Sequence, residues 1–99
     1  MKKSSYLLTP NAKNDLRGIW NYTFDIWGEQ QAEEYLFEFF KRFSWLADQP
    51  FVGTHRPEVR QGYYSFLHAE HVVFYEIINN DIVIIGIPNQ SMDIDLFFD

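Results

Sequence analysis

The chain has 99 residues, of which 46% are hydrophobic and 19% aromatic, so it is long enough for one buried core and too short for two. We therefore expect a single domain over residues 1–99. The absence of cysteine excludes a disulfide scaffold, a thiol nucleophile and a thiolate metal site. The formal net charge is −6, and residues 61–99 carry acidic residues but no Lys or Arg, which disfavours a nucleic-acid partner for that part.

The N-terminal segment predicts a short strand followed by a helix. Residues 6–9 are the strand, Thr9 supplies a capping hydroxyl, and Pro10 suits the first helical position. The start of the chain is too short and polar for a signal peptide, and no apolar run is long enough to span a membrane, so we expect a soluble, cytoplasmic protein. One apolar stripe is predicted on a helix that ends near Gly28, formed by Ala12, Leu16, Ile19, Thr23 and Ile26.

Residues 29–48 repeat the helical period, so two antiparallel helices joined at Gly28 are predicted. Tyr35, Phe37 and Trp45 fall away from the inward stripe of the second helix. Residues 54–58 are predicted to be a loop, in which Pro57 favours an extended path before it. The inward positions of the second helix are Ala32, Leu36, Phe39 or Phe40, Phe43, Leu46 and Ala47.

From Arg60 onward the pattern changes to strands, predicted at residues 63–68, 71–78 and 82–87, with a tight turn at residues 79–81. Residues 71–75 and 82–85 lack clean alternation, which indicates strands that are covered on both faces or paired centrally in the sheet. Residues 92–99 are a short tail. We expect an α+β fold, in which an N-terminal strand precedes an antiparallel helical hairpin packed on an antiparallel β-sheet. The position of the first strand in that sheet is left open by the sequence.

One set of residues is distributed along the chain from about Leu8 to Asp93: Ala12, Asp15, Leu16, Ile19, Tyr22, Trp27, Gly28, Ala32, Tyr35, Phe43, Leu46, Ala47, Pro50, Gly53, Arg56, Pro57, Arg60, Gly62, residues 71–75, Met92 and Asp93. The order and spacing of these residues resemble the ParE branch of the RelE/ParE toxin superfamily. The resemblance implies a toxin of a type II toxin–antitoxin system that binds and poisons DNA gyrase, neutralised by a ParD-like antitoxin in a hetero-oligomer. Two departures are Gly86 and Asn89, which stand where relatives often carry Arg and His, and a third is Tyr64 at a usually basic position.

The sequence predicts partner contacts rather than a catalytic or metal site, and no cofactor. A phosphate-cleaving centre needs cations, and the strand segment has none. His68 and His71 lack a metal-ligand spacing, because two residues three apart on one strand point to opposite faces. The candidate partner contacts are Tyr64, Met92, Asp93, Leu96, Phe97 and Phe98.

For the candidate contacts, alternative structural roles are open. Met92 could pack on the sheet, Asp93 could cap the last turn, and the segment Leu96 to Phe98 could dock on the helices. Two other functions are also open: an interaction-only family member that binds its antitoxin without toxicity, and an RNA-cleaving relative, which the acidic second half disfavours. We expect no sequence-specific nucleic-acid binding and no membrane partner, and an antitoxin that is basic or mixed in charge where it meets the sheet.

Overall fold

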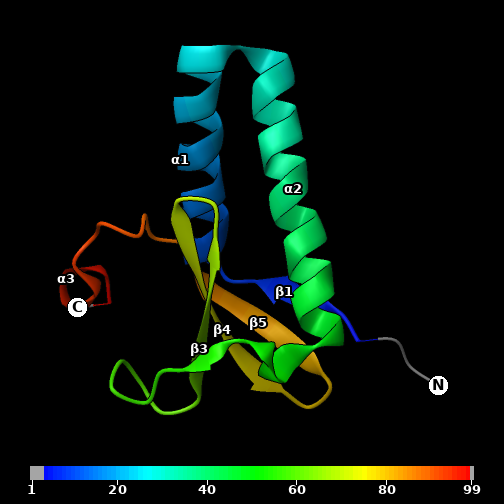
Figure 1. Cartoon of the computed structure of the whole chain (residues 1–99), viewed down its shortest axis with the longest axis vertical. Coiled ribbons are helices and arrows are strands. Elements are labelled where there is room, and N and C mark those ends of the chain that lie inside the picture. The colour runs from blue at the N-terminus through cyan, green and yellow to red at the C-terminus, as the bar shows by residue number, and fades with distance from the viewer. Residues whose placement is uncertain (1–3, 99) are drawn as a thin grey trace.

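A computed structural model describes residues 4–98 as two helices laid on one face of a five-stranded sheet (Figure 1). The sheet order is β1-β5-β4-β3-β2. The α+β architecture predicted from the sequence is confirmed. No helix in the described part has the length and apolar character needed to cross a membrane. The elements are β1 (Tyr6–Leu8), α1 (Pro10–Trp27), α2 (Glu29–Asp48), the 3-10 turn η1 (Pro50–Val52), β2 (Thr54–His55), β3 (Tyr63–His68), β4 (His71–Ile78), β5 (Asp81–Gly86) and α3 (Ile94–Phe97).

The first strand takes the place that the sequence left open. Strand β1 lies at the edge of the sheet and pairs in parallel with β5, whereas the other three strand pairs are antiparallel. Leu8 is opposite Ile84, and the next backbone amide, that of Thr9, donates to the Ile84 carbonyl at 3.1 Å. A parallel pair of strands needs a long crossover connection. Here the segment of chain between β1 and β5 contains the helical hairpin and the other three strands.

The helical hairpin begins and ends where the sequence predicts. The Thr9 hydroxyl accepts from the Ala12 amide at 3.1 Å, which caps α1. Gly28 has φ 91°, a conformation that favours glycine, and it turns the chain into α2. Four members of the predicted apolar stripe are buried, namely Ala12, Leu16, Ile19 and Thr23, whereas the fifth, Ile26, is exposed. Tyr35 and Trp45 are partly buried against the core, contrary to the expectation that they point away from it.

The core fills the layer between the helices and the sheet. Its largest members are Tyr75, Phe39 and Phe43, all fully buried. The predicted loop after α2 is in part a strand, because Thr54 and His55 pair with β3. Asn79 has φ 57° in the β4–β5 turn, as the turn prediction requires. The other buried hydrophobic side chains are Ala12, Leu16, Ile19, Ala32, Leu46, Ala47, Tyr63, Val73, Phe74, Ile82, Ile84 and Ile87.

Strand β4 explains the missing alternation in the sequence. Its pairing with β5 shifts register between Phe74 and Tyr75, and Val73, Phe74 and Tyr75 are all fully buried. Val73 and Tyr75 belong to the core beneath the helices, whereas the neighbouring Phe74 side chain contacts the C-terminal tail. The strand is therefore covered on both faces, as predicted.

Candidate partner-contact surface

The C-terminal tail returns to the sheet face opposite the helices. The ring of Phe98 meets Phe74 edge-on, with centroids 4.9 Å apart, and lies 5.6 Å from the ring of Tyr63. Phe97 contacts Phe98 at 4.8 Å. Aromatic rings in these edge-to-face arrangements stabilise the fold by more than the burial of their apolar surface alone. The tail thus docks mainly on the sheet, whereas the alternative raised from the sequence was docking on the helices. Phe97 also lines a cavity with Asn11 and Asp15 of α1.

Gly86 provides the space in which Phe97 sits. A Cβ atom at this position would lie 2.7 Å from Cε2 and 2.8 Å from Cζ of Phe97, closer than such atoms approach in proteins. On the same side, Asp15 from α1 accepts a 2.8 Å hydrogen bond from the Ile87 amide. Burial raises the pKa of the Asp15 carboxyl above its ordinary value, although that hydrogen bond and the charge of His71 both act to lower this pKa. Asp15 and Phe97 line a cavity of about 410 Å³, together with Asn11, Asn14, Val59, Arg60, Tyr63, Ile85 and Phe98.

Asn89 organises the turn that leads into the tail. Its Oδ1 accepts hydrogen bonds from the backbone amide of Ser91 at 2.9 Å and from the Ser91 hydroxyl at 2.7 Å. Its carbonyl accepts from the Met92 amide at 2.9 Å. Asp93 then caps α3, accepting from the Asp95 amide at 3.0 Å. Gly86 and Asn89, two of the positions singled out as departures from the resembled family, therefore both have structural roles here.

The tail exposes some of the predicted contacts and buries others in part. Leu96 is 73% exposed and Met92 is 47% exposed. The Asp93 side chain is also at the surface, whereas Phe97 and Phe98 are partly buried by the contacts described above. The exposed members of the group lie together on one short segment, which suits them for contact with another protein.

Tyr64 lies on the opposite side of the sheet from the tail. Its ring stacks on Tyr75 with centroids 5.7 Å apart, and lies 5.0 Å from His55 and 6.1 Å from Phe51. Beneath it, the Tyr75 hydroxyl donates to the Pro50 carbonyl at 2.8 Å. The structure therefore separates Tyr64 from the other five predicted contact residues.

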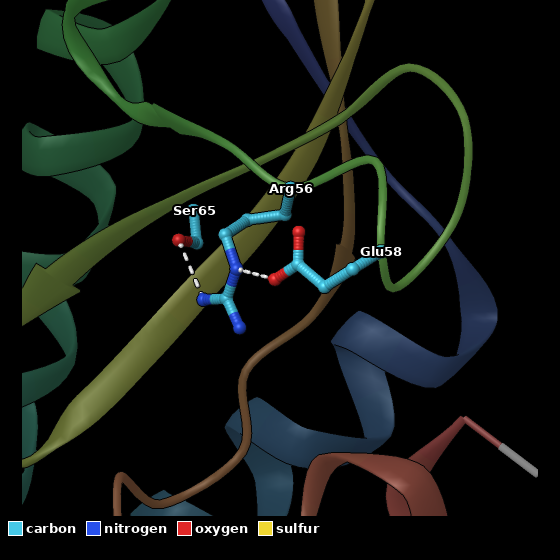
Figure 2. A network of polar contacts seen from close by, with 3 residues as sticks. All are labelled: Arg56, Glu58 and Ser65. Atoms are coloured by element: carbon cyan, nitrogen blue, oxygen red, sulfur yellow. Dashed lines mark hydrogen bonds and ion pairs between the residues drawn. The ribbon is translucent and has the colours of Figure 1, made fainter.

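Two arginines bring positive charge to the sheet face that carries the tail, which the strand sequences alone did not predict. Arg56 follows β2; its guanidinium lies 5.5 Å from the Phe74 ring and donates to the Ser65 hydroxyl at 3.2 Å (Figure 2). Arg60 lies 6.0 Å from the Tyr63 ring. The expectation that the sheet offers no cation is therefore wrong. The sequence signal for these two cations is the Arg56-Pro57 pair together with Arg60, which belong to the resembled family pattern but were not predicted as a site.

Glu58 balances the charge of Arg56. Figure 2 shows its carboxylate on the guanidinium Nε, in a charge-assisted hydrogen bond from Arg56. This hydrogen bond lowers the pKa of the Glu58 carboxyl below its ordinary value. Arg56 thus has its guanidinium engaged by Glu58, Ser65 and the Phe74 ring, an arrangement that holds the loop on the sheet.

His68 and His71 face each other across the β3–β4 turn, so the expectation that they point to opposite faces is wrong. They belong to two strands and form a cross-strand pair, both beside the Phe39 ring, with centroid distances of 4.6 and 5.7 Å. Burial lowers the pKa of both imidazoles, and the charge of Arg42, which donates to Nδ1 of His68 at 3.3 Å, lowers that of His68 further. Across residues 4–98, no cluster of three His, Cys, Asp or Glu side chains is placed to hold a metal ion.

Comparisons with known proteins agree with this fold. The family model described as "ParE toxin of type II toxin-antitoxin system, parDE" matches residues 6–94. Toxin ParE1 of Mycobacterium tuberculosis is 36% identical over 93% of this chain and 95% of its own length. Toxin ParE1 of Caulobacter vibrioides is 35% identical over 89% and 91%. A solved structure described as "Chromosomal ParDE TA system from P. aeruginosa" has a TM-score of 0.74 at 19% identity, covering 88% of this chain and 96% of the other.

Proposed function

Because this chain belongs to the ParE toxin family of type II toxin–antitoxin systems, we propose that it is a toxin that binds DNA gyrase and is held inactive by a ParD-like antitoxin. The observation that carries this proposal is the family match over nearly the whole chain. The solved neighbour with the same fold is a ParDE system, which supports an antitoxin partner. In this proposal the toxin traps gyrase on cleaved DNA and performs no covalent chemistry itself.

The surface chemistry supports docking rather than phosphate cleavage. Arg56, which lies over Phe74 on the tail-bearing sheet face, is already engaged by Glu58 and Ser65. Burial lowers the pKa of both His68 and His71, which lie beside Phe39 of α2. Arg56 lies on the sheet face opposite these histidines, and Arg42, the cation beside His68, is engaged by that imidazole and by the Trp45 and Phe66 rings. This arrangement does not favour a centre for phosphate cleavage.

We propose that Met92, Asp93 and Leu96 contact the target or the antitoxin, while Phe97 and Phe98 hold this segment on the sheet. Two apolar side chains on a short segment are exposed to solvent, and burying them against a partner would stabilise the complex. Tyr64, on the other side of the sheet, would contribute to a second, separate contact. An antitoxin that wraps around the chain would reach both sides.

The direct test adds the purified chain to DNA gyrase with plasmid DNA and measures supercoiling and cleaved DNA. We expect cleaved DNA to accumulate, and Met92→Ser with Leu96→Ser to reduce this at least tenfold, equivalent to about 1.4 kcal/mol of binding energy. Leu7→Ser, at an exposed position on edge strand β1, is the matched control and should behave as wild type. Unchanged supercoiling at excess protein contradicts the gyrase proposal.

An interaction-only role is the second candidate, favoured by Gly86, Asn89 and Tyr64 at positions where relatives often carry basic residues. Both roles require the antitoxin, so co-purification with the product of the neighbouring gene supports either. Growth after induction without that gene separates them: arrest with damaged DNA supports the toxin, and normal growth supports the interaction-only role. Specific cleavage of a messenger RNA on ribosomes would contradict both.

A further inference from the structure

The cavity beside Asp15 brings together side chains from three segments that are distant in the sequence. Its volume of about 410 Å³ is within the range of sites that hold a small molecule. A cavity in which polar and aromatic groups converge in this way is a candidate binding site. Its lining includes Asn11 and Asp15 of α1, Arg60 and Tyr63 from the segment that leads into β3, and Phe97 and Phe98 of the tail.

Helix α1 supplies the hydrogen-bonding groups of the cavity. Asn11 and Asp15 lie on the same face of the helix, because residues four apart are neighbours there. Asp15 uses Oδ2 for the Ile87 amide at 2.8 Å, and its other oxygen has no hydrogen-bond partner among residues 4–98. The oxygen of the Asn14 side chain accepts from Arg17 at 3.2 Å, which leaves the amino group of Asn14 to donate. The helix therefore offers a free carboxylate oxygen with carboxamide donors beside it.

The charge and the walls of the cavity restrict the kind of ligand. Arg60 forms no ion pair within the described part of the chain, and its charge cancels that of Asp15, the other charged residue among the described lining. The ring of Phe98 lies 5.6 Å from that of Tyr63 and 4.8 Å from that of Phe97. A lining with no net charge and with aromatic rings suits a flat, uncharged, polar ligand.

We propose that this cavity binds the guanine base of a nucleoside. Guanine presents two adjacent donors, N1–H and the N2 amino group, on one edge and two acceptors, O6 and N7, on another. The Asp15 carboxylate accepts from the donor edge, Arg60 donates to O6 and N7, and the ring of Phe97 stacks on the base. Adenine and cytosine each place an acceptor next to their amino group, so the carboxylate disfavours them.

A bound base also holds the C-terminal tail in place, because Phe97 and Phe98 form one wall of the cavity and α1 forms another. The amides of Phe97 and Phe98 donate to the carbonyls of Asp93 and Ile94 at 3.0 and 3.1 Å. Guanosine should slow hydrogen exchange at these two amides, since a ligand stabilises the state that binds it. The amide of Gly28, at the far end of the helical hairpin, is the control and should exchange at an unchanged rate.

The first test titrates the full chain with nucleosides and measures binding by calorimetry or NMR. We expect guanosine to bind about tenfold or more tightly than adenosine, because a matched pair of hydrogen bonds discriminates between bases to that extent. Inosine, which lacks the N2 amino group, and 7-deazaguanosine, which has carbon in place of N7, should both bind more weakly than guanosine. Guanosine monophosphate should bind no more tightly than guanosine, because the lining has no net positive charge.

The second test changes the two charged side chains. Asp15→Asn keeps an oxygen for the Ile87 amide but puts a donor in place of the free acceptor, so guanosine should bind about tenfold or more weakly. Asp25→Asn, at an exposed position of the same helix, removes the same charge and should bind as wild type. In Arg60→Met, guanosine and 7-deazaguanosine should bind equally, because the donor to N7 is gone.

The outcomes that overturn the proposal are specific to the base. They are no saturable binding of guanosine, equal binding of adenosine, unchanged affinity in a folded Asp15→Asn chain, or tighter binding of guanosine monophosphate than of guanosine. Circular dichroism checks the fold of each variant. If Asp15→Asn does not fold, the nucleoside series on the wild-type chain decides the question.

Discussion

Gly86→Ala tests whether the tail docks where the structure places it. The added Cβ would lie within 2.8 Å of two Phe97 ring atoms, so the ring must move. Gly86 does not have a positive φ, so alanine suits the backbone and the clash is the main effect. Because full burial of a phenylalanine side chain contributes about 1.5–3 kcal/mol and Phe97 is partly buried, its displacement should cost about 1–2 kcal/mol of unfolding free energy.

A double-mutant cycle with Phe97→Ala isolates this contact. In the Phe97→Ala background there is no ring to displace, so Gly86→Ala should be neutral or stabilising by up to about 1 kcal/mol, as alanine restricts the unfolded chain. Urea denaturation followed by tryptophan fluorescence gives the four free energies, and hydrogen exchange reports release of the tail. An equal cost of Gly86→Ala in both backgrounds would refute the docking of Phe97 on Gly86.

Three further predictions concern the core, the first helix and the paired histidines. Tyr75→Phe removes a buried hydroxyl with two hydrogen bonds and should lower the unfolding free energy by about 1–3 kcal/mol, whereas exposed Tyr22→Phe should change it by less than about 0.5 kcal/mol in the same urea titration. Thr9→Ala removes the helix cap and a hydrogen bond to β5 and should cost about 1–2 kcal/mol by thermal or urea unfolding; an unchanged midpoint would contradict this role. The folded state lowers the pKa of His68 and His71, so stability should be fully present above the unfolded imidazole pKa of about 6.5 and fall as pH drops toward the lower folded values; replacing both with Gln should flatten that slope.

Local signals predicted the element boundaries well, because the residues that set them act through their own backbone. Thr9 and Pro10 begin α1, and Gly28 ends it with a left-handed φ. The predicted apolar stripe includes Ile26, which is exposed, because periodicity identifies a helix face without showing how far the neighbouring layer extends. The parallel pairing of β1 with β5 joins residues far apart in sequence, and no local pattern encodes it.

The candidate site was less predictable, because its contacts depend on packing between distant segments. Phe97 and Phe98 appear as exposed tail residues in the sequence, and only the sheet geometry shows that Gly86 leaves room for one of them. A spacing of three residues on one strand would put His68 and His71 on opposite faces, whereas a two-residue turn places them opposite each other on the same face. In the sequence, Arg56 lies in a predicted loop and outside the predicted strands, and the fold brings this loop over Phe74.

The residues at the departures from the resembled family are tied into the fold, which limits how the family's basic side chains could be restored. An arginine at position 86 would need the volume that Phe97 fills, so it would displace the tail that carries Met92 and Leu96. A histidine at position 89 would remove the amide oxygen that accepts both Ser91 hydrogen bonds. If the gyrase assay is positive, the chain must therefore engage its target without these basic groups, through surfaces such as the exposed tail segment. A gain of activity in Gly86→Arg with the tail still docked would contradict this reasoning, because the arginine and the Phe97 ring cannot occupy the same space.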